Sequence, residues 1–151
     1  MKKAPDFSLK DTNMKDVGLQ DFKGNKNIVL LFFPLAFSSV CTDELCTTRD
    51  NMKIYESLNA EVLGISVDSM FTLKAFKESN NINFTLLSDF NKEVSGKYEA
   101  LYDDFYGMKG VSKRAVFLIN KEGRIVYSEI LEDADNIPNF SKVQQVLAGL
   151  N

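Results

Sequence analysis

The segment "NIVLLFFP", from Asn27 to Pro34, says most about the fold of this chain. Its apolar residues run without alternation and stop at a proline, which is typical of a short strand buried on both faces of a sheet. The next residues, "LAFSSVC", lead directly into a helical pattern. A buried strand that turns at once into a helix predicts an α/β fold.

Further strands and helices are predicted on both sides of this segment. The strand candidates are "EVLGISV" (61–67), "NFTLLSD" (83–89), "RAVFLIN" (114–120) and "RIVYSEI" (124–130). The turn "KEG" predicts that the last two form a hairpin. Helical patterns cover 40–59, 69–79, 92–99 and 138–149, and "FSLKDTNMKDVGLQDFKG" (7–24) predicts a short N-terminal hairpin. We therefore expect one domain over 1–151, with a mixed central sheet flanked by helices.

Composition narrows the possible functions. The 151 residues are enough for one domain with a real core. A net charge of -3 and a pI near 5.0 give no reason to expect a nucleic-acid partner or an anionic membrane surface. Histidine is absent, which excludes histidine acid–base catalysis, histidine-ligated metals and a Cys–His nucleophile pair. Any chemistry must come from cysteine, carboxylate, basic, tyrosine or hydroxyl groups.

The expected location is the cytoplasm. The opening "MKKAPDFSLKDTN" lacks the apolar run of a signal peptide. The longest apolar stretch, Ile28 to Phe33, is too short to span a bilayer. In a reducing compartment two cysteines are more often reduced or reactive than permanently bridged.

Both cysteines, Cys41 and Cys46, lie at the start of the 40–59 helical pattern, five residues apart. This spacing is neither a C-x-x-C redox pair nor a usual zinc-ligand spacing. On a helical wheel Cys41 falls in the apolar half and Cys46 in the middle of the polar half. Glu44 also falls in the apolar half, where a buried carboxylate needs a charged or hydrogen-bonding partner. We therefore expect the two thiols to have different environments.

Cys41 is the candidate nucleophile. In the first turn of a helix, unpaired N–H groups and the helix dipole favour the thiolate, the reactive form of cysteine. Ser38 could cap the helix and donate to the sulfur or to a substrate oxygen. Arg114, at the start of the 114–120 strand, is the candidate basic group and could also pair with Glu44. Two plainer interpretations stay open: Cys41 as a small core residue, and Cys46 as an inert exposed thiol.

The segment "PLAFSSVC" (34–41) matches the Pro-x-x-x-Thr/Ser-x-x-Cys signature of the peroxiredoxins, cysteine peroxidases with a thioredoxin fold. The resemblance extends, in the same order, over nearly the whole chain. It includes "APDFSL", "LQDFKG", "IVLLFFP", "VLGISVDS", "FTLLSD" and "RAVFLINKEGRIVYS". It implies a thioredoxin-like fold and peroxide reduction that needs no metal, flavin or haem.

The resemblance also implies a role for each site residue. Cys41 corresponds to the peroxidatic cysteine, and Pro34 to the proline that shields its sulfur. Ser38 corresponds to the hydroxyl residue that binds peroxide, where threonine is more common in the family. Arg114 corresponds to the arginine that contacts substrate and thiolate, and Glu44 to the glutamate that positions it. The Cys41 N–H, the Ser38 hydroxyl and Arg114 would stabilise the leaving oxygen as Cys41 becomes a sulfenic acid.

Cys46 matches the resolving cysteine of the Q-type branch, related to bacterioferritin comigratory protein, which lies five residues after the peroxidatic one. A one-cysteine branch, related to alkyl hydroperoxide reductase E, shares "FFPLAF" and lacks that thiol. Residues i and i+5 of a helix have Cα atoms about 8–9 Å apart, whereas a disulfide needs less than about 7 Å. If the thiols pair, this part of the helix must unwind.

We expect Cys46 to resolve the sulfenic acid. The alternatives are a one-cysteine peroxidase resolved by an external thiol and a thioredoxin-fold redox sensor. The expected partners are a peroxide and a reductant, which could be thioredoxin, glutaredoxin or a small thiol. The chain is expected to act as a monomer or a homodimer.

Overall fold

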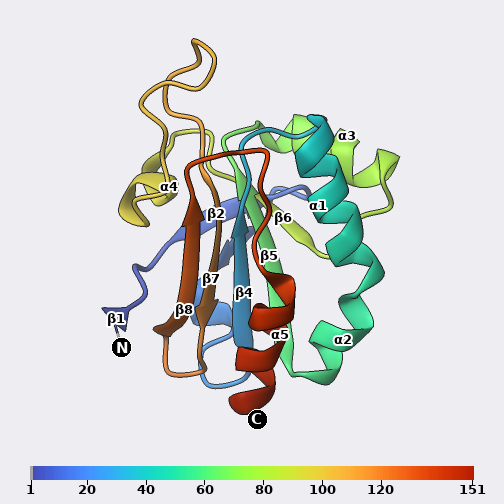
Figure 1. The fold of residues 1–151 in the computed structure, drawn as a ribbon, viewed down its shortest axis with the longest axis vertical. Helices are drawn as coiled ribbons and strands as arrows, with labels where there is room; N and C mark the ends of the chain where they lie inside the picture. The colour runs from blue at the N-terminus through green and yellow to red at the C-terminus, as the bar shows by residue number, and fades with distance from the viewer. Residues whose placement is uncertain (1) are drawn as a thin grey trace.

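The computed structural model describes residues 2–151, which form eight strands, five α-helices and one short 3-10 helix. The strands are β1 (Lys2–Lys3), β2 (Ser8–Asp11), β3 (Asp16–Gly18), β4 (Asn27–Phe32), β5 (Ala60–Ser66), β6 (Thr85–Ser88), β7 (Arg114–Ile119) and β8 (Arg124–Leu131). The helices are η1 (Leu19–Asp21), α1 (Ser39–Asp50), α2 (Met52–Ser57), α3 (Met70–Ser79), α4 (Glu93–Lys97) and α5 (Phe140–Gly149). Figure 1 shows their arrangement.

The strands form one sheet in the order β1-β8-β7-β4-β5-β6-β2-β3. Strands β4, β5 and β6 pair in parallel, whereas β7 runs antiparallel to both β4 and β8. All six residues of β4 and all six of β7 are buried, as expected for continuous apolar strands at the centre of a covered sheet. The predicted α/β class, the mixed sheet and the final hairpin are confirmed. The predicted N-terminal hairpin is β2–β3, which pairs with β6.

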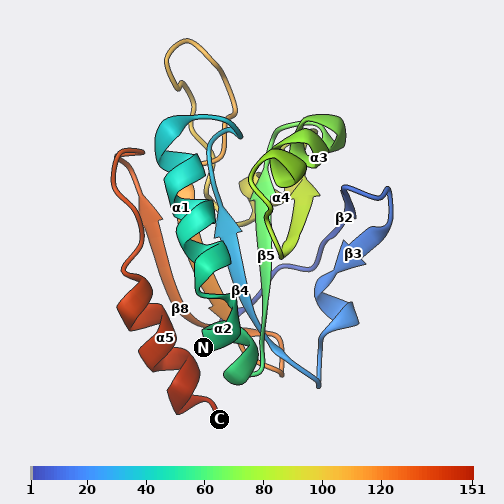
Figure 2. The same cartoon turned by 90° about the vertical axis from the view of Figure 1, so that its right-hand side faces the viewer.

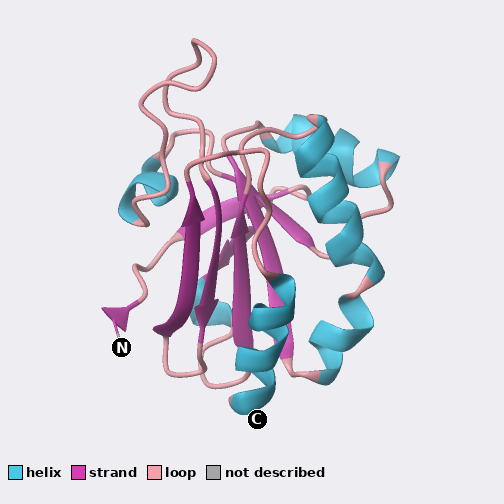
Figure 3. Ribbon diagram, viewed as in Figure 1, coloured by secondary structure: helices cyan, strands magenta, loops and turns pink. Residues whose placement is uncertain are grey.

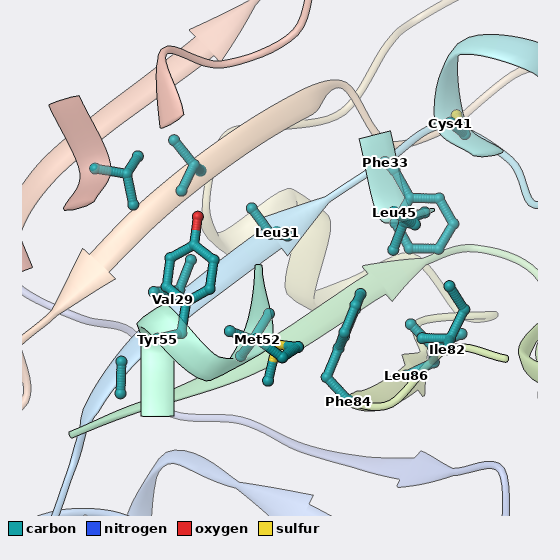
Figure 4. Close-up of a cluster of buried hydrophobic side chains, with 14 of the residues drawn as sticks. Val29, Leu31, Phe33, Cys41, Leu45, Met52, Tyr55, Ile82, Phe84 and Leu86 are labelled. Atoms are coloured by element: carbon teal, nitrogen blue, oxygen red, sulfur yellow. The ribbon is translucent and has the colours of Figure 1, made fainter. Parts of the chain in front are cut away.

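Helices cover both faces of the sheet, as Figure 3 shows by secondary structure. One core cluster joins the sheet to α1, α2, α3 and α5, and α1 lies between α5 and α3 in Figure 2. The cluster on the other face includes Val94 of α4, Leu19 of η1 and the N-terminal residues Ala4 and Phe7. In Figure 4, Cys41 lies at one end of the first cluster, beyond Phe33 and Leu45. The start of α1 is therefore attached directly to the core.

The predicted helix over 40–59 is wrong in one respect, because the structure has two helices separated at Asn51. The Asn51 amide donates to the carbonyl of Thr47 at 3.0 Å, and its backbone N–H bonds to Thr48 in a tighter, 3-10-type turn. Asparagine is a poor helix former because its side chain competes for backbone groups in this way.

Two other helices are shorter than predicted, because of residues that flank them. Helix α5 begins at Phe140 rather than at 138, since the Asn139 side chain accepts from the Lys142 N–H and caps the helix. Helix α4 covers Glu93–Lys97 rather than 92–99, because Lys92 before it and Glu99 after it are both in the left-handed conformation, with φ 66° and 57°. No helix within residues 2–151 is long and apolar enough to cross a membrane.

Candidate active site

The candidate site lies where β4 passes into α1. The Phe33 N–H still bonds to the Ile65 carbonyl at 3.0 Å, and the buried Pro34 then ends this pairing with β5. Helix α1 begins at Ser39, which places Cys41 in its first turn with the side chain fully buried. The N–H groups of this turn have no partner within the helix and face the same end as the thiol. They favour negative charge at that position.

The loop before α1 is fixed by Asp68, a residue that the sequence analysis missed. Its carboxylate accepts from the Ala36 N–H at 2.7 Å and from the Ser66 hydroxyl at 2.6 Å. Burial raises the pKa of Asp68, and these two hydrogen bonds oppose the rise. The sequence did carry a signal, because Asp68 follows the buried strand β5 at the edge of the sheet where β4 also ends. A carboxylate at that place can reach the neighbouring loop.

Phe37 gives the same loop a second point of attachment. Its backbone has φ 70°, a left-handed conformation that is uncommon for a bulky residue. Its ring packs edge-to-face on Phe76 of α3, with 5.2 Å between ring centroids. An aromatic pair of this kind contributes about 0.5–1.5 kcal/mol beyond its area burial, which helps to offset the backbone strain.

Arg114 is buried at the start of β7 and joins three groups of the site. Its Nη2 lies 3.3 Å from the Cys41 Sγ, and its Nη1 lies 2.8 Å from Glu44 Oε1. Its Nε and Nη2 both donate to the Ala134 carbonyl, at 3.1 and 2.8 Å. Burial disfavours the charged guanidinium, but the nearby Glu44 and Cys41 outweigh burial and raise the pKa of Arg114. The predicted association of Cys41, Glu44 and Arg114 is present in the structure.

Glu44 is turned inward, as its position on the helical wheel predicted. Burial raises its pKa from 4.5 to about 7, although the charge and the hydrogen bond of Arg114 act in the opposite direction. Only Oε1 is bonded to Arg114. The other oxygen, Oε2, is buried without a hydrogen-bond partner among the described residues. The described residues therefore provide a hydrogen-bond partner for only one of the two Glu44 oxygens.

Ser38 occupies the N-cap position of α1, but its side chain does not cap the helix as expected. The exposed hydroxyl instead donates to the Leu35 carbonyl at 2.8 Å. The Ser38 backbone carbonyl accepts the first hydrogen bond of the helix, from the Thr42 N–H, and also a bond from the Thr42 hydroxyl, so the first N–H groups of α1 receive no side-chain cap. Because the hydroxyl proton is already engaged, Ser38 is arranged to accept a hydrogen bond from a ligand rather than to donate one.

Cys46 is half-buried and packs against the core, which corrects its expected place on the solvent-facing side of the helix. Its Sγ lies 3.8 Å from the Asn80 Oδ1 at the end of α3. Arg49 also contacts Asn80, donating to its carbonyl at 2.6 Å. The helical-wheel prediction was wrong because the polar side of a helix faces solvent only where no other element covers it. Here the end of α3 covers the polar side of α1. Both cysteines are free thiols on a single helix.

These contacts suit one kind of chemistry, the reaction of a thiolate with an electrophile. A buried sulfur receives a guanidinium on one side and the start of a helix on the other, and both stabilise its negative charge. Within residues 2–151 no group of three or more carboxylate or thiol side chains could hold a metal ion.

Comparison with known proteins adds relatives of the same kind. A model of the AhpC/TSA family matches residues 1–128. The chain is 35% identical over 132 residues to alkyl hydroperoxide reductase E of Mycobacterium tuberculosis, covering 87% of this chain and 85% of the relative. It is 37% identical over 138 residues to the chloroplastic 2-Cys peroxiredoxin BAS1 of Spinacia oleracea, covering 85% of this chain but only 51% of that protein. This chain thus spans about half the length of the spinach protein.

The fold agrees with solved structures. The crystal structure of peroxidoxin BcpB from Mycobacterium tuberculosis superimposes with a TM-score of 0.88 at 25% identity, over 99% of this chain and 96% of the other. The family model and the M. tuberculosis relative each span more than four-fifths of this chain. This chain therefore belongs to the AhpC/TSA family, the peroxiredoxins, which are thiol-dependent peroxidases built on a thioredoxin-like fold.

Proposed function

We propose that this protein reduces hydrogen peroxide and organic hydroperoxides, with Cys41 as the nucleophile and Cys46 as the thiol that resolves the product. The observation that carries the proposal is the 3.3 Å contact between Arg114 Nη2 and the buried Cys41 Sγ, at the start of α1. A core cysteine without a function needs no buried cation beside it, because burying a charge is costly even when the charge is paired. A reactive thiolate does need one.

The proposed reaction begins with attack of the Cys41 thiolate on one peroxide oxygen. An S–O bond forms while the O–O bond breaks, so one peroxide oxygen stays on the sulfur, which is oxidised to a sulfenic acid. The other oxygen leaves as hydroxide or alkoxide and becomes water or an alcohol when it takes up a proton. Arg114 and the Cys41 N–H would stabilise the charge that develops on the oxygens. Ser38 would accept a hydrogen bond from the bound peroxide, and the buried Pro34 would keep water from the sulfur.

In the second step Cys46 would attack the sulfenic sulfur, release water and form a disulfide with Cys41. Two cysteines five apart on an intact helix are out of bonding range, so α1 must first unwind locally. Threonine and aspartate are weak helix formers, and Thr42, Asp43, Thr47 and Thr48 occupy this part of α1, which makes unwinding less costly. A reductant such as thioredoxin, glutaredoxin or a small thiol would then restore both thiols.

A one-cysteine mechanism is the second candidate, and the position of Cys46 favours it. That thiol is half-buried against Asn80, on the same continuous helix as Cys41. Local unwinding would have to break this contact and strain the nearby bond from Arg49 to the Asn80 carbonyl. If unwinding is slower than the arrival of an external thiol, Cys46 is a spectator and the reductant attacks Cys41 directly.

The wider proposal is a single peroxiredoxin domain over 1–151 that acts in the cytoplasm as a monomer or a homodimer. The support is the continuous sheet, which takes strands from both ends of the chain, and the two free thiols. Neither a nucleic acid nor a membrane partner is proposed. The chain's own residues supply every group that the thiolate step requires, so no cofactor is invoked.

Peroxide consumption with an excess of dithiol reductant tests the activity. Wild type should consume peroxide far faster than a free thiol does, and Cys41→Ser should lose this advantage. A wild-type rate no greater than that of a free thiol would contradict the proposal and favour a redox sensor. Intact mass after one equivalent of peroxide, without reductant, separates the two mechanisms. A loss of about 2 Da indicates the disulfide, whereas a gain of about 16 Da indicates a stable sulfenic acid and the one-cysteine mechanism.

A further inference from the structure

Cys41, Arg114 and Glu44 form a buried row in which one cation separates two acidic groups. The Arg114 guanidinium bonds to the Cys41 Sγ at 3.3 Å and to Glu44 Oε1 at 2.8 Å. All three side chains are almost completely buried, with exposed fractions of 0%, 1% and 1% for Cys41, Glu44 and Arg114. The two other hydrogen bonds of Arg114 both go to a neutral group, the carbonyl of Ala134. No second cation is bonded to either acidic group among the described residues.

The charge of this row depends on the state of the sulfur. With Cys41 as thiolate and Glu44 ionised, the buried groups would carry two negative charges against one positive charge. Electrostatic interactions are strong where water is excluded, so an uncompensated buried charge is unfavourable. With the thiolate in place, a protonated Glu44 makes the row neutral. After oxidation to the uncharged sulfenic acid, an ionised Glu44 makes it neutral again.

Two further observations decide which acid holds the proton before oxidation. Cys41 lies in the first turn of α1, where the helix end favours a negative charge, whereas Glu44 lies one turn further on. Glu44 Oε2 has no hydrogen-bond partner within residues 2–151, and an unpaired oxygen is costlier to bury on a carboxylate than on a neutral carboxyl group. Oε2 is therefore the natural position for the proton, while Oε1 continues to accept from Arg114. The raised pKa of Glu44, about 7, agrees with this assignment.

We infer that Glu44 is a proton reservoir linked to the redox state of Cys41, protonated beside the thiolate and ionised beside the sulfenic acid. This rests on the proposed peroxidase function. For hydrogen peroxide, the thiolate and HOOH give the sulfenic acid and hydroxide, and the proton lost from Glu44 balances the hydroxide as water. Glu44 acts through Arg114 and does not contact the peroxide, so it is a positioning residue. Reduction of Cys41 back to the thiolate returns the proton to Glu44.

The ionisable groups that face this row are few. From β7 the group is Arg114 itself, and from α1 the groups are Cys41 and Glu44. Tyr102 interacts electrostatically with Arg114, and burial keeps the pKa of its hydroxyl above its usual value, so it stays neutral near pH 7. Arg114 stays charged and Tyr102 stays neutral near pH 7, whereas burial raises the pKa of Glu44 to about 7. The proton that the row exchanges when the sulfur is oxidised is therefore carried by Glu44 or by the reacting sulfur.

Infrared difference spectroscopy of the Cys46→Ser protein tests the inference, because this background stops the reaction at the sulfenic acid. One equivalent of peroxide at pH near 7 should remove the carbonyl band of a protonated carboxyl group and produce a carboxylate band. Labelling with ¹³C-glutamate should shift the lost band and so assign it to a glutamate without any change of sequence. Adding Glu44→Gln should abolish the band, whereas the matched control Glu78→Gln, at an exposed position, should leave it unchanged.

Proton uptake gives a second readout that a purely structural role of Glu44 would not change. In weak buffer with an indicator dye, wild-type Glu44 should supply the proton, so the Cys46→Ser protein takes up almost none from solution. The protein that also carries Glu44→Gln should take up about one proton more for each sulfenic acid formed. Sulfenic acid formed without loss of a protonated-carboxyl band, or with equal proton uptake in the two proteins, would overturn the inference. Failure to form any sulfenic acid would instead contradict the proposed function.

Discussion

Cys41 and Cys46 occupy one continuous helix, with Cys41 fully buried in its first turn and Cys46 half-buried against Asn80, which follows α3. They belong to different contact networks, because Cys41 bonds to Arg114 from β7 and Cys46 contacts the end of α3. Neither thiol can reach the other while the helix and both contacts persist. Oxidation by an internal disulfide must therefore change the structure of α1.

Hydrogen exchange should detect this change. After one equivalent of peroxide, amides of residues 42–46 should lose protection by about tenfold or more, because a disulfide prevents the helical hydrogen bonds there from re-forming. Amides of β4 should keep their protection and serve as the internal control. A disulfide seen by mass with unchanged protection of 42–46 would contradict the geometric argument.

Asp68→Ala should weaken both stability and activity, since it leaves the partly buried Ala36 N–H without its acceptor. The expected loss is about 1–3 kcal/mol of unfolding free energy, with the oxidation rate of Cys41 lower by about one to two orders of magnitude as the loop shifts. Asp68→Asn keeps an oxygen that can accept from Ala36 and should lose less. Chemical unfolding and stopped-flow oxidation measure the two effects.

The control for Asp68 is Asp16→Ala, because Asp16 is exposed and makes a surface ion pair with Lys10 at 2.9 Å. Such a pair contributes less than about 1 kcal/mol, so stability should change little and the oxidation rate not at all. Equal effects at the two positions would mean that Asp68 has no particular role in the loop.

Arg114→Lys should lower the rate of Cys41 oxidation by about 10²–10³-fold although it keeps the positive charge. A lysine ammonium cannot reproduce the planar fork that reaches Cys41, Glu44 and the Ala134 carbonyl together. Arg124→Lys, at an exposed position on the neighbouring strand β8, is the matched control and should react like wild type. A near-normal rate for Arg114→Lys would show that charge alone is sufficient.

Phe37→Gly and Phe37→Ala should separate backbone strain from ring packing. Both variants lose the edge-to-face contact with Phe76, but only alanine still strains a backbone at φ 70°. The glycine variant should therefore be the more stable of the two by up to about 1 kcal/mol at matched conditions. Thermal unfolding gives the comparison, and a more stable alanine variant would show that this conformation is not maintained.

Stability should fall with rising pH through the titration of Glu44. The folded-state pKa is about 7 and the ordinary value is 4.5, so the folded protein binds more protons than the unfolded chain between these values. The contribution is complete below about pH 4.5 and is lost as pH rises through about 7, with a slope of at most about 1.4 kcal/mol per pH unit. Unfolding free energies of the reduced protein measure this slope.

Other titrating groups also affect the dependence of unfolding free energy on pH, so the contribution of Glu44 is measured by comparing variants. Glu44→Gln should remove the slope that Glu44 adds between pH 4.5 and 7, whereas Glu78→Gln should retain it. Parallel curves for wild type and Glu44→Gln would mean that Glu44 keeps the same proton affinity in the folded and unfolded states.

Sequence reasoning succeeded where local pattern and long-range structure agree. The apolar runs at Asn27 to Phe33 and at 114–120 located the central strands almost to the residue. The inward position of Glu44 and its pairing with Arg114 followed from one rule, that a buried carboxylate needs a partner. Each of these features follows from residue type and spacing alone.

Features created by neighbouring elements could not be predicted in the same way. A helical wheel considers one helix alone and takes no account of α3, so it predicted that Cys46 faces solvent. Ser38 was expected to cap the helix by its hydroxyl, yet the Leu35 carbonyl is near enough to take that proton. Asp68 lies 32 residues from Ala36, the N–H that it binds, and only the pairing of β4 with β5 brings the two together.

The bond from Arg114 to the carbonyl of Ala134 has a consequence for anyone who shortens or transplants this domain. The acceptor is a main-chain atom, so almost any side chain could stand at position 134 and no comparison of residue identities would reveal its importance. It also lies beyond residue 128, where the match to the family model ends. A graft cut at that boundary would carry every recognisable motif and still lack the group that orients its arginine.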